Sequence, residues 1–81
     1  MITTGQVQIN LSTPTRIIAA NKKRVLVQLR ADGPVAYGGD NTVTAAKGFV
    51  AQKMLQLTDT GEVWAIGAAG FAGLVYFIEE A

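Results

Sequence analysis

The chain contains no cysteine and no histidine. Without cysteine it can form neither disulfides nor thiolate metal sites, and without histidine it lacks the commonest neutral metal ligand. The same two absences remove the side chains on which much nucleophilic catalysis depends. The sequence therefore predicts no metal and no cofactor. We expect a chain of 81 residues to gain stability by self-association or by docking on a larger body.

Charged residues are scarce as well. They make up 16% of the chain, against about 25% in a typical soluble domain. The seven basic and six acidic residues nearly cancel, so no electrostatic attraction favours nucleic acid or an anionic membrane as the main partner. A small domain is mostly surface, and hydrophobic residues form 49% of this one. Part of the apolar surface is therefore expected to contact another molecule.

One segment, residues 63–78, has no charge at all. It is shorter than the roughly 20 residues that span a bilayer, and it contains Gly67, Gly70 and Gly73. We interpret it as a strand, a glycine-rich turn and a second strand. The start of the chain, Met1 to Gly5, has neither the basic nor the apolar region of a secretory signal. We therefore expect a single domain, residues 1–81, that does not enter a membrane.

Alternation of apolar and polar residues with a period of two dominates the sequence, and no segment keeps a helical period of 3.6. The clearest strand covers residues 24–31, where Val25, Val27 and Leu29 point one way. Turn residues such as Asn21-Lys22-Lys23, Asp32-Gly33-Pro34 and Asp59-Thr60-Gly61 separate about eight short strands. This spacing predicts an all-β protein, a small antiparallel jelly-roll-like sandwich, with a small Greek-key barrel as the alternative.

The last two predicted strands, 62–67 and 74–79, are apolar on both faces and are expected to form a hairpin. One set of side chains is expected to fill the core: Leu74, Tyr76 and Ile78. The other set faces outward and is the candidate protein interface: Trp64, Val75 and Phe77. A strand in a sandwich normally presents one polar face to water. An apolar outer face therefore indicates a subunit interface. A central strand covered by a loop is the alternative.

The remaining nucleophile and carboxylates lie where turns explain them. Ser12 adjoins Thr13-Pro14 and is expected to bond its own backbone. Asp32, Asp40 and Asp59 lie in turns that contain glycine or asparagine. The segment 38–41, Gly-Gly-Asp-Asn, lacks both the helix that follows a phosphate-binding loop and the spaced oxygens of a calcium loop. We therefore predict no catalytic residue and do not expect an enzyme.

Two other functions remain open. A module that recognises a host glycan or protein would use loop residues, for which the candidates are Tyr37, Asp40 and Asn41. A single-stranded nucleic-acid-binding barrel would combine basic residues with stacking aromatics; the basic residues are Lys22, Lys23, Arg24 and Arg30, and the aromatics are Tyr37, Trp64 and Tyr76. Trp64 and Tyr76 are far from the basic cluster in sequence, so nucleic acid is the least favoured partner.

An ordered series of residues extends over most of the chain, from about residue 15 to residue 78. It consists of Asn21 and Arg24, the strand Val25-Leu26-Val27-Gln28-Leu29, then Pro34-Val35-Ala36-Tyr37-Gly38-Gly39, Val43-Thr44, Gly48-Phe49 and Gly61-Glu62-Val63-Trp64-Ala65-Ile66. This series resembles the small β-sandwich virion proteins of tailed bacteriophages, which include capsid decoration or cement proteins and head-fibre-like proteins.

The resemblance implies a structural role on the virion, at the capsid surface, for a protein made in the host cytoplasm. The implied function is stabilisation of the phage head through protein–protein contacts, and the alternative is a tail or fibre module. The implied partners are the major capsid protein or another virion protein, together with further copies of the chain in a dimer or trimer. The resemblance implies no catalytic residues.

Overall fold

The computed structural model describes residues 1–81 and contains eight strands and no helix. The strands are β1 (Ile2–Gln8), β2 (Thr15–Ile18), β3 (Leu26–Ala31), β4 (Val35–Gly38), β5 (Phe49–Ala51), β6 (Met54–Leu57), β7 (Val63–Gly67) and β8 (Leu74–Glu80). No helix is present that could cross a membrane.

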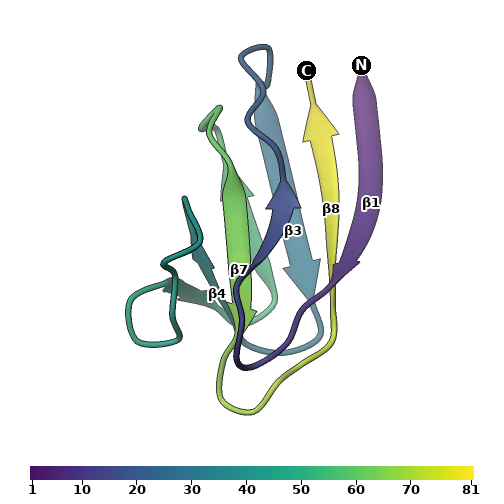
Figure 1. The fold of residues 1–81 in the computed structure, drawn as a ribbon. Helices are drawn as coiled ribbons and strands as arrows, with labels where there is room; N and C mark the ends of the chain where they lie inside the picture. The colour runs from purple at the N-terminus through teal and green to yellow at the C-terminus, as the bar shows by residue number, and fades with distance from the viewer.

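The strands form two antiparallel sheets with the orders β1-β8-β3-β6 and β2-β7-β4-β5 (Figure 1). The two halves of the chain pair as the arms of one long hairpin would: β1 with β8, β2 with β7, β3 with β6 and β4 with β5. A long hairpin rolled into two facing sheets is a jelly roll, the eight-stranded form of the double-sheet sandwich. The predicted all-β sandwich of jelly-roll type is therefore confirmed.

Consecutive strands pair only between β4 and β5. The expected hairpin of 62–67 with 74–79 is wrong, because β7 and β8 belong to different sheets. The connection between them turns sharply at Ala69 and Gly70, which have φ angles of 50° and 82°. At Gly67 a Cβ atom would lie 1.9 Å from the carbonyl oxygen of Phe71. The chain therefore crosses from one sheet to the other instead of folding back beside itself.

Alternate side chains of the strands fill the space between the sheets. The fully enclosed core residues include Ile9, Val27, Leu29, Val35, Ala65 and Val75. Burial of each large aliphatic side chain contributes roughly 1.5–3 kcal/mol. For the strand predicted at residues 24–31, the inward orientation of Val27 and Leu29 is confirmed. Val25 lies before β3 and is exposed.

The orientation of β8 is the reverse of the expected one. Val75 is completely buried and Phe77 packs against the core, where its ring lies over Gly5 of β1. Ile78 is exposed and lies on the opposite face. The physical reason is the strand's last inward residue, Glu79, which is buried in an ion pair with Arg24. Because side chains alternate along a strand, that pair also directs Val75 and Phe77 inward.

Candidate protein interface

The outer face of the β2-β7-β4-β5 sheet is covered at its two central strands, β7 and β4, by the protein's own chain. The loop between β4 and β5 places Val43 on Ala36 and Ile66, and these three side chains are buried together. Gly38 and Gly48 leave room for Val43, since a Cβ atom at either position would lie 2.8 Å from its side chain. The alternative interpretation, a central strand covered by a loop, thus describes β7.

The outer face of the β1-β8-β3-β6 sheet is not covered. The strand registers place thirteen side chains on it: Ile2, Thr4, Gln6 and Gln8 from β1; Leu74, Tyr76, Ile78 and Glu80 from β8; Leu26, Gln28 and Arg30 from β3; and Met54 and Gln56 from β6. We call this set the uncovered face. Ile2, Met54 and Ile78 are 64%, 60% and 40% exposed, and Arg30 and Glu80 are the only charged members.

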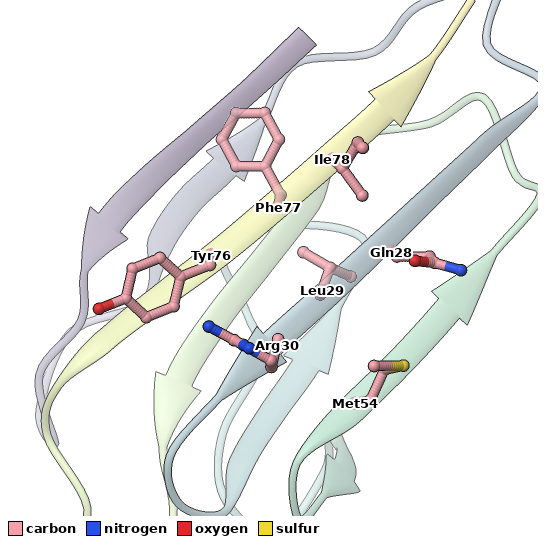
Figure 2. Close-up of a pocket in the computed structure, with 7 residues that line it drawn as sticks. All are labelled: Gln28, Leu29, Arg30, Met54, Tyr76, Phe77 and Ile78. Carbon is pink, nitrogen blue, oxygen red and sulfur yellow. The ribbon is translucent and has the colours of Figure 1, made fainter. Parts of the chain in front are cut away.

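The centre of the uncovered face is a shallow cavity of about 270 Å³. Figure 2 shows Tyr76, Arg30, Gln28 and Met54 projecting around it. The guanidinium carbon of Arg30 lies 5.4 Å from the centroid of the Tyr76 ring, within the range of a cation–π interaction. Gln28 Nε2 donates a hydrogen bond of 3.1 Å to Gln56 Oε1. Tyrosine, arginine and methionine are enriched in protein interfaces and lysine is depleted, and the uncovered face has this composition.

The three residues predicted as the interface do not share a surface. Trp64 lies on the covered side of the molecule, partly buried against Val43 and Ile66, and its Nε1 is buried without a hydrogen-bond partner. Val75 and Phe77 point between the sheets. The predicted set assumed the reverse orientation of β8, so it does not form one surface of the molecule. The outward-facing residues of that strand include Tyr76, which is half-buried, and Ile78, which is exposed. Both were expected to fill the core.

The loop-recognition candidates are likewise separated. Tyr37 belongs to β4 and points into the core, whereas Asp40 and Asn41 lie in the exposed loop that follows. The hydroxyl and backbone N–H of Thr42 donate to Asp40 Oδ1 and hold the pKa of that carboxyl below its usual range. Asp40 thus bonds its own turn. No group of three or more acidic, histidine or cysteine side chains that could hold a metal ion is present.

The predicted basic cluster is not formed. Arg24 is buried, and its Nε donates a 2.7 Å hydrogen bond to Glu79 Oε2. Its remaining nitrogens donate to the carbonyl oxygens of three loop residues, Ala19, Asp59 and Gly61. Lys22 and Lys23 are exposed in the turn before β3, and Arg30 lies on the uncovered face. These four residues therefore do not make one patch for a phosphate backbone.

Tyr37 lines a cavity of about 450 Å³ with Phe49 of β5 and Leu55 of β6. Only 4% of the Tyr37 surface is exposed, and this burial raises the pKa of Tyr37 from 10.0 to about 12. The raised pKa means that the folded protein favours the neutral phenol over the phenolate, since the phenolate would be desolvated.

We expect the free energy of unfolding to fall as the pH rises from about 10 to about 12. In that window the unfolded chain has released the Tyr37 proton and the folded chain retains it, so alkali favours the unfolded state. The loss should be at most about 3 kcal/mol. Urea denaturation at a series of pH values from about 10 to about 12 measures this loss of unfolding free energy. The Tyr37→Phe variant should lack most of the decline. An equally steep decline in Tyr37→Phe would contradict the assignment.

Comparisons with known proteins do not assign a function to these surfaces. No protein-family model matches the chain, and no similar curated protein or solved structure was found. The functional interpretation therefore rests on the geometry of the uncovered face.

Proposed function

We propose that the protein is a structural component of a tailed-phage virion, a decoration or cement protein that stabilises the head by binding the major capsid protein or another virion protein. The observation that supports this most is the uncovered face. The central strands of one sheet are covered by the protein's own loop, whereas the other sheet exposes Ile2, Met54 and Ile78 on its outer face. Jelly rolls recur in viral capsid proteins, although a fold alone does not define a function.

The dimensions of the molecule allow such a contact. The two longer dimensions of the molecule, 34 and 22 Å, bound an area of roughly 750 Å², and a standard protein interface buries about 800 Å² per partner. Removing the apolar part of that area from water contributes roughly 25 cal/mol per Å². Since Arg30 and Glu80 are the only charges on the face, attachment should depend weakly on salt. The proposal includes association with further copies of the chain.

The test compares two variants in which the same charge is added on opposite sides of the molecule. Ile78→Asp places a carboxylate on the uncovered face, and Val50→Asp places one on the outer side of β5. The two side chains are similarly exposed, 40% and 43%. Both variants should fold, because neither side chain belongs to the core. We expect only Ile78→Asp to be lost from purified virions, with occupancy measured by quantitative mass spectrometry.

The copy number in wild-type virions is the second measurement. A decoration protein should be present in a fixed ratio to the major capsid protein, in many copies per particle, whereas a tail or fibre module should be present in few. Absence from purified virions, or equal retention of both variants, would refute the proposed function.

A further inference from the structure

The four edge strands of the sandwich differ in how they are protected. Strand β5 has three residues and β6 has four. Strand β2 also has four residues, carries the charged Arg16 and has a register shift between Arg16 and Ile18. Short length, charge and irregularity are the usual means of preventing an edge strand from pairing with another chain. Each of these three edges therefore has at least one of these protections.

Strand β1 has none of them. It is seven residues long, contains no charged residue and no proline, and keeps an unbroken register with β8 from Ile2 to Gln8. Figure 1 shows it at the border of its sheet, with β8 on one side and no strand on the other. An edge that is long, regular and uncharged is a template for a further strand.

The backbone groups of β1 that face this free edge can be identified. The amino group of Met1 donates to the carbonyl oxygen of Ala81, and the Ala81 N–H donates to the carbonyl oxygen of Met1. At the other end of the strand, the Ile9 N–H donates to the Gly73 carbonyl oxygen. In an antiparallel ladder such pairs recur at every second residue, so Thr3, Gly5 and Val7 bond to β8. The intervening residues direct their N–H and C=O groups to the free edge: Ile2, Thr4, Gln6 and Gln8.

We infer that β1 is the self-association edge of the protein, on which β1 of a second copy pairs antiparallel about a two-fold axis at Gly5. The inference rests on the self-association in the proposed function but not on the virion role. A two-fold axis there places Thr4 of each copy opposite Gln6 of the other, and Ile2 opposite Gln8. All outward backbone groups of both strands then find partners, in roughly eight hydrogen bonds.

The residues of β1 are self-complementary in this arrangement. Since the strand has no charge, an antiparallel copy brings no like charges together. The two Gly5 residues meet on the axis as a non-hydrogen-bonded pair, in which the backbones approach most closely, and neither has a side chain to obstruct that approach. The Phe77 ring already packs over Gly5 on the inner face. Two copies joined in this way form one continuous eight-stranded sheet and place their uncovered faces side by side.

The experiment compares proline at two edge glutamines. Gln6→Pro removes an outward N–H of β1 and leaves its bonds to β8, a position at which an edge strand tolerates proline. Gln56→Pro is the matched control. The Ala31 N–H donates to the Lys53 carbonyl oxygen, and β6 bonds to β3 at every second residue counted from Lys53. Gln56 falls between two such residues, so its N–H points to the free edge of β6. Light scattering over a concentration series should show a wild-type dimer. We expect Gln6→Pro to raise its Kd at least about tenfold and Gln56→Pro to leave it unchanged.

Hydrogen exchange of the wild-type protein tests the pairing without any substitution. On dilution below the Kd, the amides of Thr4, Gln6 and Gln8 should lose protection, while those of Gly5 and Val7 keep it. A strict monomer at all concentrations would overturn both the edge pairing and self-association. A dimer that Gln6→Pro does not weaken, with uniform exchange along β1, would overturn the edge pairing alone. Virion occupancy of Ile78→Asp reports separately on the virion role.

Discussion

Replacement of Arg24 by methionine should lower the free energy of unfolding by about 3–5 kcal/mol. Arg24 and Glu79 form a buried pair, with side chains 0% and 10% exposed. Removing the guanidinium leaves the Glu79 carboxylate without a partner in the protein interior. It also removes the donor to three loop carbonyl groups, which join the end of β2 and the β6–β7 connection to the start of β3. A domain of this size has a total stability of about 4–12 kcal/mol, so Arg24→Met should be close to unfolding.

Urea denaturation followed by Trp64 fluorescence measures this loss, and two further variants identify its cause. Arg24→Lys keeps the charge but cannot reproduce the planar set of donors, so it should lose less than Arg24→Met and more than 1 kcal/mol. The double variant Arg24→Met with Glu79→Met removes both charges and should be more stable than Arg24→Met alone. A loss below about 1 kcal/mol in Arg24→Met would show that the ion pair does not stabilise the fold.

The sequence was sufficient to predict the fold class because the relevant signals are local. A period of two is readable in any window of six residues, as in Val27 and Leu29, and glycine, asparagine and aspartate indicate where the chain turns. These signals do not state which strands pair. Asp59-Thr60-Gly61 can close a hairpin or lead from one sheet to the other, and here it lies between β6 and β7, which belong to different sheets.

The candidate site was harder to predict, since both faces of β8 are apolar and only a distant partner distinguishes them. Glu79 shares a face with Val75 and Phe77, and an unpaired carboxylate belongs at the surface. Its partner Arg24 is 55 residues away in sequence and stands beside Lys22 and Lys23, where it resembles part of a basic cluster. A buried ion pair between segments so far apart leaves no local pattern. The orientation of β8, and with it the uncovered face, therefore required the tertiary structure.

The two neighbouring aromatic residues of β8 should respond in opposite ways to the same substitution. Phe77→Asp should lower the free energy of unfolding by about 4 kcal/mol or more, because it removes a packed ring and places a carboxylate between the sheets. Tyr76→Asp should cost only about 1 kcal/mol, through the low strand propensity of aspartate, since its side chain lies on the uncovered face beside Arg30.

Urea denaturation of the two variants measures this difference, and Phe77→Leu serves as a milder control that keeps the site apolar. The comparison bears directly on function, because only a folded variant can report on an interface. If Phe77→Asp folds normally and Tyr76→Asp unfolds, β8 has the opposite orientation and the uncovered face is not a surface. If Tyr76→Asp folds and is lost from virions together with Ile78→Asp, the two substitutions define the contact on one side of one strand. Since Val75 belongs to the core and Phe77 packs against it, that contact would use Tyr76 and Ile78 and not their inward neighbours.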